Sequence, residues 1–467
     1  MPYTRRMFLR DSAATSSLAL TTLGGALSSF GAGAADTEGY RALVCVFLFG
    51  GLDNHDTLLP YDQASYDEFA TIRSTLLARQ GESRLRENLL PLVTADPEQF
   101  GGRQFALPPE LAGIKAIYDQ GKAAIVANVG PLIVPTDRQA YEEQSVPVPS
   151  RLFSHNDQQI TWQASAPEGA QFGWGGLFAD AAVAAGANGA PEFSTIGSVG
   201  TGVFLSGQLA QPYNVSAGGA ERMRLLELLE ERVGAPGGAG ALQLARALLR
   251  DQVYAGGHVL AQDIGAGFRA AIDSNERYNE AIGGGEALQT EFPESELGIS
   301  LRTIAEAISV RQNLQASRQV FFVGLGGFDT HSTQADVLPG LLSTVDAAVS
   351  AFYAEMVAQG IANDVTLFTA SDFGRTLAVN DDGTDHGWGG HHFVLGGSVQ
   401  GGAIYGDMPP VGFGHSQDSG NGRLIPTVAV EQYAEPMGRW FGLDDSELAL
   451  ALPNLANFAA EPGLTFL

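Results

Sequence analysis

Cysteine is nearly absent from this chain, in which Cys45 is the single one among 467 residues. A lone cysteine forms no internal disulfide, so the fold must be stabilised by its apolar core. Cys45 lies within an apolar run, and its simplest role is that of a small core residue. The length suits one large α/β domain with insertions better than a minimal domain.

Basic residues are also scarce. The chain has 26 lysines and arginines against 52 aspartates and glutamates, which gives a net charge of −26. Such an acidic surface excludes nucleic acid as a partner, because it repels phosphates. An anionic substrate therefore needs a pocket in which an arginine or a metal ion reverses the local sign.

A hydrophobic run long enough to span a membrane is missing at the N-terminus. Paired arginines at Arg5 and Arg6 precede a weakly apolar run over residues 13–30, which Ser, Thr and Gly interrupt. The run is shorter than the ~20 apolar residues of a membrane span, and Ala32-Gly33-Ala34 has the form of a signal-peptidase site. We predict a twin-arginine export signal over residues 1–35, no membrane span after its removal, and a periplasmic or extracellular location. The alternative is an amphipathic N-terminal helix.

Buried strands are indicated by four apolar runs, three of which follow helix-like stretches. The runs cover Arg41–Gly51, Ala123–Gly130, Gln319–Gly324 and Asp364–Ala370, and the helix-like stretches cover Leu111–Gln120, Ile304–Ala316 and Leu341–Gln359. Helix followed by strand, repeated, is typical of a doubly wound, mostly parallel sheet. We therefore predict the α/β class.

Two stretches interrupt this rhythm within a predicted single domain, residues 36–467. Residues 131–200 are rich in Pro, Gly, Ser and Gln, which favours loops crossing the top edge of the sheet. Residues 219–290 contain helical patterns between glycine-rich joints, which indicates a helical insertion or cap.

Histidine is also scarce, and most of the histidines lie in segments of similar composition. Of eight histidines, six lie in or beside Gly/Asp/Ser-rich segments, and three segments place Asp and His together: DNHD from Asp53, FDTH from Phe328 and TDH from Thr384. Carboxylates and imidazoles on strand-end loops can converge on one divalent metal ion, with zinc, calcium and magnesium as the candidates. The alternative for each single pair is a hydrogen-bonded turn.

Two further segments carry candidate reactive groups. In SDFGRT, Asp372 is a candidate ligand and Arg375 can bind an oxyanion, or the two can close a turn as a salt bridge. In SHND, Ser154 is a candidate nucleophile that a metal ion would activate, or else an N-cap residue of a following helix. A metal-free serine hydrolase ranks last because the chain lacks a G-x-S-x-G motif.

These segments together resemble the domain-of-unknown-function family 1501, a bacterial family of twin-arginine-exported proteins within the alkaline phosphatase and sulfatase-like superfamily. The resemblance covers nearly the whole chain after residue 35. It rests on the segments VFLFGGLDNHDTLLPYD from Val46, SHNDQQITWQ from Ser154, GGFDTHS from Gly326, SDFGRT from Ser371, GTDHGWGGHHFVLGGSVQGGAIYG from Gly383 and IPTVAVEQYAEPMGRWFGL from Ile425.

The resemblance implies an alkaline-phosphatase-like fold with three α/β/α layers and a set of site residues. The implied metal ligands are Asp53, Asp329, His331, Asp372 and His386, and the implied nucleophile is Ser154. Two departures put a second metal site in doubt. Phe373 stands where the superfamily has a histidine after aspartate, and Asp329 and His331 are more closely spaced than the superfamily pair. His391 or His392 is a conceivable substitute ligand.

Two functions follow from these observations. The first is a metal-dependent hydrolase or transferase of phosphate or sulfate esters, with an anionic small molecule or glycan ester as substrate and Arg375 holding a non-reacting oxygen. The second is a non-catalytic envelope protein that uses the same fold to bind a glycan or a protein. The first is favoured by the clustering of potential ligands.

Overall fold

A computed structural model of the chain describes residues 35–94, 98–198, 202–217, 219–220, 228, 231–234, 238–247, 259–461 and 463–467. The predicted export signal lies outside the described residues except for Ala35. Parts of the predicted insertion, among them residues 221–227 and 248–258, lie outside them too.

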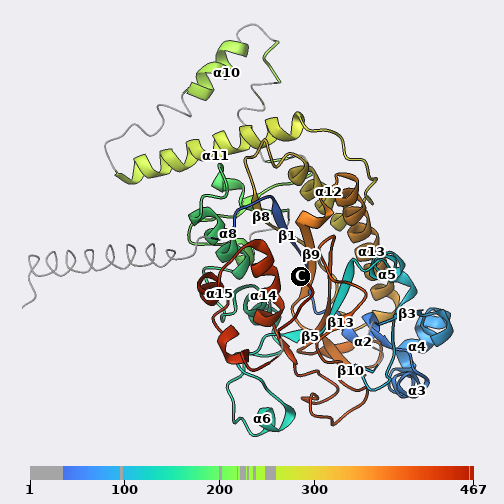
Figure 1. Cartoon of the computed structure of the whole chain (residues 1–467). Coiled ribbons are helices and arrows are strands. Elements are labelled where there is room, and N and C mark those ends of the chain that lie inside the picture. The colour runs from blue at the N-terminus through green and yellow to red at the C-terminus, as the bar shows by residue number, and fades with distance from the viewer. Residues whose placement is uncertain are drawn as a thin grey trace, which may run out of the picture.

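A mostly parallel sheet of nine strands forms the centre of the protein (Figure 1). Its strands follow the order β13-β5-β12-β9-β1-β8-β6-β7, and β14 also pairs with β5. Only β12 among them runs antiparallel to its neighbours, β5 and β9. The strands are β1 (Arg41–Leu48), β5 (Ala123–Gly130), β6 (Thr195–Gly197), β7 (Tyr213–Asn214), β8 (Arg318–Leu325), β9 (Val365–Ser371), β12 (Gly390–Gly396), β13 (Ile404–Tyr405) and β14 (Val428–Ala429).

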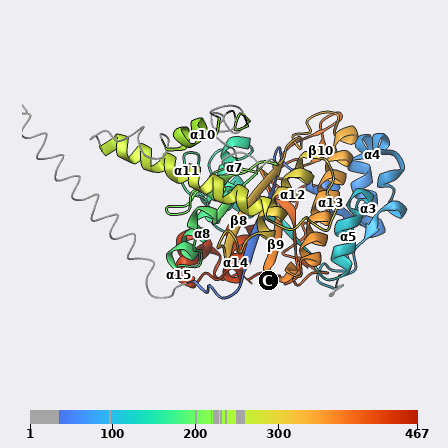
Figure 2. The ribbon, with the colours of Figure 1, turned by 90° about the horizontal axis from the view of Figure 1, so that it is seen from above.

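Helices cover both faces of this sheet (Figure 2). Val44 and Val46 of β1 belong to a core shared with α5 (Ala112–Asp119), α12 (Glu296–Ser309) and α13 (Gln334–Ala358). Cys45 and Phe47 point to the other face and pack in a core with α8 (Trp174–Ala184), α14 (Val430–Phe441) and α15 (Asp445–Ala451). Because successive side chains of a strand alternate between faces, one buried strand supplies both cores. The three-layer α/β/α class with a mostly parallel sheet is confirmed.

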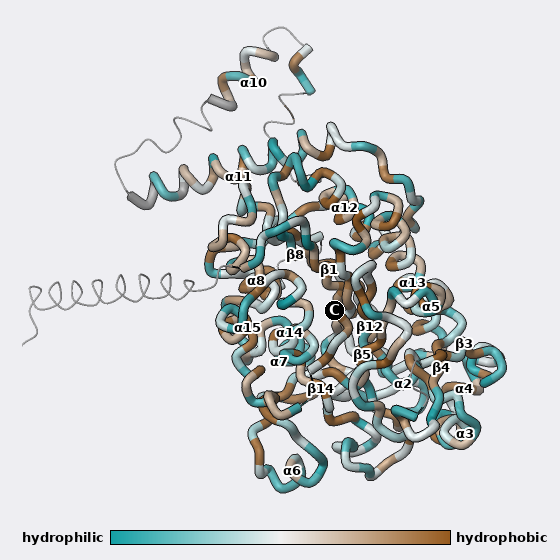
Figure 3. Tube along the Cα trace, viewed as in Figure 1, coloured by the Kyte–Doolittle hydropathy of each residue, from teal (hydrophilic) through white to brown (hydrophobic). Residues whose placement is uncertain are grey.

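The four predicted strands are confirmed within a few residues at each end, and the expected core role of Cys45 holds. The predicted helix 111–120 matches α5, and α13 begins seven residues before the predicted Leu341. The polar residues in the first turn of α13 mask its start in the sequence. Figure 3 shows the central strands as hydrophobic and the outer loop around α6 (Arg138–Glu142) as hydrophilic.

The expectation that residues 131–200 are loops is wrong over much of that stretch, which contains α6, α7 (His155–Ala164) and α8. The glycines that suggested a loop are used for close packing. A Cβ on Gly175 would lie 2.5 Å from the ring of Phe204, and one on Gly176 would lie 2.2 Å from the backbone of Ser206. Glycine here allows a helix to approach its neighbour, at a cost in helix propensity that packing offsets.

The described part of the predicted insertion includes two helices, α10 (Gly238–Ala247) and α11 (Val259–Gly283). Figure 1 shows α11 along one end of the sheet, with α10 beyond it. Tyr278 of α11 is buried in the core that contains α12.

Among the described helices, α13 alone is long and apolar enough to cross a membrane by length and composition, and a third of its apolar window is buried. Its buried face, including Leu338, Val345 and Phe352, packs into the core beside α5 and α12. This packing is that of a helix covering a sheet.

Shorter elements lie along the chain between β1 and β5 and between β9 and β12, and they carry several polar residues of interest. They are α2 (Asn54–Thr57), β2 (Leu59–Pro60), α3 (Gln63–Ile72), α4 (Ser74–Gln80), β3 (Leu90–Pro91), β4 (Phe105–Leu107), β10 (Arg375–Val379) and β11 (Thr384–His386).

Candidate metal centre

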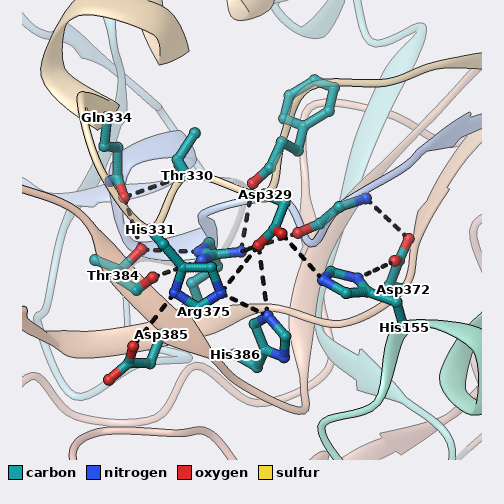
Figure 4. Close-up of polar contacts among 12 residues, drawn as sticks. His155, Asp329, Thr330, His331, Gln334, Asp372, Arg375, Thr384, Asp385 and His386 are labelled. Atoms are coloured by element: carbon teal, nitrogen blue, oxygen red, sulfur yellow. Dashed lines mark hydrogen bonds and ion pairs between the residues drawn. The ribbon is translucent and has the colours of Figure 1, made fainter.

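Three side chains from distant parts of the chain converge where β1, β8 and β9 end (Figure 4). His155 begins α7, Asp329 follows β8, and His386 ends β11. One nitrogen or oxygen of each lies within 4.8 Å of the others, which is close enough for all three to bind one metal ion. Ligand sites of open α/β sheets lie at this carboxyl edge of the strands.

The ring of His155 is held with one nitrogen free. Its Nδ1 lies 2.6 Å from Oδ2 of Asp372, a carboxylate that only accepts, so Nδ1–H donates and Nε2 of the neutral ring keeps its lone pair. The Nε2 atom is buried, has no hydrogen-bond partner among the described residues, and lies 3.4 Å from Oδ2 of Asp329. The hydrogen bond to Asp372 raises the pKa of His155 against the effect of burial. A free, oriented Nε2 backed by a carboxylate is typical of a metal-ligating histidine.

His386 has the same arrangement with a different second partner. Its Nδ1 donates to the carbonyl oxygen of Phe153 at 2.6 Å, which leaves the lone pair on Nε2, 3.4 Å from Oδ1 of Asp329. Burial, with His155 and Arg375 nearby, lowers the pKa of His386 and favours the neutral ring that binds metals. Phe153 has a φ of 73°, an uncommon value for a bulky residue, and its carbonyl fixes the ring.

His331 is a possible fourth ligand at the open side of the group. Its Nε2 lies 2.8 Å from Nε2 of His386 and 3.2 Å from Oδ1 of Asp329, and its Nδ1 lies 3.4 Å from Asp385. The side chain is 45% exposed, so this position faces solvent. The predicted ligands Asp329, His331 and His386 are therefore brought together.

Asp329 carries the negative charge of the group. Partial burial would raise its pKa, but Arg375 and the nearby histidines outweigh burial and lower it. The Asp329 carboxylate is therefore ionised at neutral pH. Gly50 permits the approach of this loop to β1, because a Cβ there would lie 2.3 Å from the Asp329 nitrogen.

The aromatic ring of Phe373 packs against both half-buried histidines. Its centroid lies 4.8 Å from that of His155 and 4.7 Å from that of His386. The residue that departs from the superfamily pattern therefore packs against two candidate ligands and offers no ligand atom of its own. Contact with both rings restricts their rotation.

Asp372 does not face the centre directly. It is fully buried, and its Oδ2 accepts from His155 and from Gln159 Nε2 at 2.8 Å, while Oδ1 accepts from the Gly50 backbone at 3.1 Å. The predicted ligand Asp372 therefore lies outside the three-residue group, and it orients the ring of His155 through a hydrogen bond.

Asp53 also lies apart from the three-residue group, and both of its oxygens are engaged. Arg73 pairs with it at 2.5 and 3.1 Å, Gln334 donates to it at 2.5 Å, and the backbone of His55 donates at 3.0 Å. Burial opposes its ionisation, yet Arg73 lowers its pKa overall. A guanidinium therefore supplies the positive charge that the resemblance assigns to a metal ion.

Arg73 was not anticipated from the sequence. It follows α3, outside every Asp/His segment, and no pattern at that position indicates a partner for Asp53. Its side chain is 2% exposed and also donates to the carbonyl oxygens of Thr376 and Leu377. His155 lies in the SHND segment, of which only Ser154 is predicted from the sequence as a site residue.

Arg375 is fully buried with its guanidinium occupied by the protein. It donates to the carbonyl of Gly50 at 2.9 Å, to the hydroxyl and carbonyl of Thr384 at 2.9 and 2.5 Å, and to Oδ1 of Asp329 at 3.2 Å. These contacts join the ends of β1, β8 and β11. The geometry suits a residue that positions Asp329, rather than a turn-closing pair with Asp372.

Ser154 occupies the N-cap position of α7 without a side-chain capping bond. Its hydroxyl donates instead to Oδ2 of Asp157 at 2.6 Å. The residue directly precedes His155, so it lies at the edge of the centre beside a carboxylate able to accept its proton.

His391 and His392 lie outside the group. Both are buried in β12, where His391 Nδ1 accepts from the Asn128 backbone and His392 packs edge-on against Trp162. Burial, helped in His391 by neighbouring histidines, lowers the pKa of each to about 3.

The residues present fit a metal ion. Two neutral imidazole nitrogens and one carboxylate are the donors that Zn²⁺ and similar transition metals prefer, whereas calcium and magnesium favour oxygen ligands. The unpartnered, buried Nε2 of His155 is the strongest sign, since such atoms are costly without a partner.

Comparison with solved structures finds distant likenesses. One is "Crystal structure of Ps i-CgsB in complex with k-i-k-neocarrahexaose", with 9% identity, a TM-score of 0.36, and coverage of 90% of this chain and 77% of that one. Another is the lipoteichoic acid synthase LtaP from Listeria monocytogenes, with 9% identity, a TM-score of 0.28, and coverage of 82% and 71%.

The sequence itself matches a family model. No curated protein matches the chain. Residues 40–450, which contain the sheet and every residue of the candidate centre, match the model described as "Protein of unknown function (DUF1501)". The chain therefore belongs to the DUF1501 family.

Proposed function

We propose that this protein is a metal-dependent hydrolase or transferase of phosphate or sulfate esters that works outside the cytoplasm. The observation that carries the proposal is the convergence of His155 and His386 on Asp329, with the second nitrogen of each ring already bonded. The ester class is supported by the superfamily resemblance, and the location by the paired arginines of the N-terminal segment.

The roles of the residues follow from their contacts. His155, His386 and Asp329 would hold the ion, and His331 would be a fourth ligand from the solvent side. When bound, the ion would polarise an ester oxygen and lower the pKa of a nearby hydroxyl or water. Asp372 and the Phe153 carbonyl keep both Nε2 lone pairs aimed at the centre, and Arg375 keeps Asp329 in place.

Two nucleophiles are compatible with this centre. The Ser154 hydroxyl is bonded to Asp157 at 2.6 Å, so Asp157 can take its proton as the oxygen attacks phosphorus or sulfur. Otherwise a water attacks directly. In both cases the bond from phosphorus or sulfur to the alcohol oxygen breaks, and the alcohol leaves with a proton from water. After attack by Ser154, a water must then hydrolyse the seryl ester, and the proton on Asp157 returns to the serine oxygen. One ion suffices in this scheme, because Arg73 already neutralises Asp53.

The test begins with mature protein stripped by a chelator and reloaded separately with zinc, manganese, calcium or magnesium. We expect hydrolysis within a panel of aryl phosphates, phosphodiesters and aryl sulfates, and its loss in His155→Ala and His386→Ala. Metal-loaded protein that hydrolyses no ester in the panel would contradict the proposal.

The second candidate is a non-catalytic envelope protein that binds a glycan or protein. Two residues favour it. Phe373 stands where the superfamily has a histidine ligand, and Arg73 supplies beside Asp53 the positive charge that a metal ion would supply. Glycan binding that survives both the chelator and Ser154→Ala, in protein without esterase activity, would support it. Loss of that binding on chelation would count against it.

A further inference from the structure

An open pocket with an apolar floor lies between α14, α15 and the residues that follow α15. Figure 1 shows α14 and α15 side by side, and they are in contact. The volume of the pocket is about 470 Å³, within the ~300–1,000 Å³ of ordinary ligand sites. Its floor includes Leu448, Leu452, Leu455 and Phe458. A space of this size and character can hold a few apolar side chains of a peptide.

The rim of this pocket is acidic and open to solvent. Arg439 donates to Glu435 at 2.9 Å and to Asp445 at 2.8 Å, and the two carboxylate side chains are 24% and 87% exposed. Glu461, also on the rim, is exposed and forms no ion pair within the described part of the chain. Three carboxylates thus surround one guanidinium, which favours a cationic occupant.

The N-terminal part of the chain enters the described structure beside the same two helices. The backbone N–H of Asp36 donates to the carbonyl oxygen of Gly442, the residue that caps α14, at 2.8 Å. Ala35 is 6% exposed and belongs to the same core as Leu448 of α15. Residues 1–34 precede this point and lie outside the described residues. They are therefore tethered where α14 and α15 meet.

The composition of this N-terminal segment complements the pocket. Residues 4–10 read TRRMFLR, with three arginines, no carboxylate, and Met7, Phe8 and Leu9 together. The arginines match the acidic rim, and the three apolar side chains match the floor. An extended chain gains about 3.3–3.6 Å per residue, against about 1.5 Å for a helix, so the segment is long enough to cross α15.

We propose that the pocket between α14 and α15 binds residues 4–10 of the same chain before residues 1–35 are removed. The tether raises the effective concentration of the segment to about the millimolar range, so weak contacts suffice to populate the docked state. Docking would hold Arg5 and Arg6 against the folded body, and removal of the segment would reopen the pocket. This inference does not depend on the function proposed for the metal centre.

The experiment uses disulfide cross-linking in the full chain. Met7→Cys is combined with Ala456→Cys, an exposed position that lines the pocket, and Cys45 does not interfere because it is buried. The matched control combines Met7→Cys with Ala347→Cys, an exposed position on α13. Under mild oxidation we expect the pocket pair to cross-link about tenfold faster or more, because docking keeps its cysteines close together. Mass spectrometry identifies the product and confirms that residues 1–35 are present.

Charge variants test the acidic rim. Glu435→Gln together with Glu461→Gln should slow the cross-link several-fold, and high salt should do the same. Glu82→Gln together with Glu286→Gln changes the net charge equally at exposed positions outside the pocket and should leave the rate unchanged. Circular dichroism confirms that each variant is folded. A free peptide of residues 4–10 should compete at millimolar concentration, whereas the same peptide with glutamine in place of arginine should not.

Three results would overturn the proposal. Equal cross-linking rates at positions 456 and 347 mean that the segment has no preference for the pocket. A fast cross-link that neither the rim variants nor salt slows means that the acidic rim does not bind the arginines. A cross-linked dimer as the main product assigns the pocket to a second copy of the chain.

Discussion

His155 and Asp372 are 217 positions apart in the chain, yet Nδ1 of one donates to Oδ2 of the other at 2.6 Å. The bond leaves a single nitrogen of the histidine for the metal centre. It also assigns the aspartate, a candidate ligand by its position after β9, to an orienting role.

Replacement of Asp372 by asparagine should weaken metal binding without abolishing it. The isosteric amide keeps the volume but loses the charge that orients His155, and loss of such partners typically lowers metal affinity about 10–100-fold. Isothermal titration with zinc measures the change. Asp119→Asn, at an exposed position, is the matched control. Complete loss of binding would mean that Asp372 is itself a ligand.

Replacement of Asp53 by asparagine should lower the stability of the fold and leave metal binding unchanged. The change leaves Arg73 buried without its partner, which typically costs about 3–5 kcal/mol. Urea unfolding should show this loss, while metal content per chain stays at the parent value at temperatures where the variant is folded. If the zinc stoichiometry falls instead, Asp53 holds an ion.

The buried histidines of β12 should make the protein sensitive to acid. Burial lowers the pKa of His391 and His392 to about 3, whereas an unfolded histidine has a pKa near 6.5. Their contribution is complete above pH 6.5 and is lost as pH falls toward 3, because the unfolded chain binds the protons first. At pH 5, protonation of each histidine in the unfolded chain has removed roughly 2 kcal/mol of stability.

His392→Phe tests this reasoning, because the new ring can keep the contact with Trp162 and cannot titrate. The slope of unfolding free energy against pH between 4 and 6 should decrease by about 1.4 kcal/mol per pH unit, the value for one proton. An unchanged slope would show that His392 is protonated in the folded protein.

Gly50→Ala should disturb the position of Asp329. Gly50 has a φ of 116°, and a new Cβ would lie 2.3 Å from the Asp329 nitrogen. Gly81→Ala is a strict control, because it has a φ of 64° and open space around the new atom. We expect backbone strain of about 1–3 kcal/mol in both variants, a further steric cost in Gly50→Ala, and reduced zinc affinity in Gly50→Ala alone. Equal zinc affinities would contradict the proposed coupling.

Ser154→Ala distinguishes the two nucleophiles. If the serine oxygen attacks, turnover of the preferred ester falls by orders of magnitude and a covalent phosphoryl or sulfuryl adduct, seen by mass spectrometry of the parent, disappears. If water attacks, turnover changes only a few-fold. Zinc affinity should be unchanged in either case, since Ser154 is not among the ligands.

The strands could be predicted because continuous apolar runs leave few alternatives to a buried strand. The convergence of Asp329 and His386 was also foreseeable, since both follow or end elements at one edge of the sheet. The role of Arg73 could not be foreseen, because a buried ion pair depends on tertiary distance and leaves no periodic pattern. Helix α8 was missed for a related reason, as its glycines are used for contact with Phe204 and Ser206.

The three residues of the metal centre span 232 positions, and they meet only where β8, α7 and β11 are all in place. A partly folded chain therefore holds these side chains too far apart to capture an ion. Metal occupancy would then indicate that folding is complete. A bound ion would in turn stabilise the folded state, because it binds the folded chain and not the unfolded one.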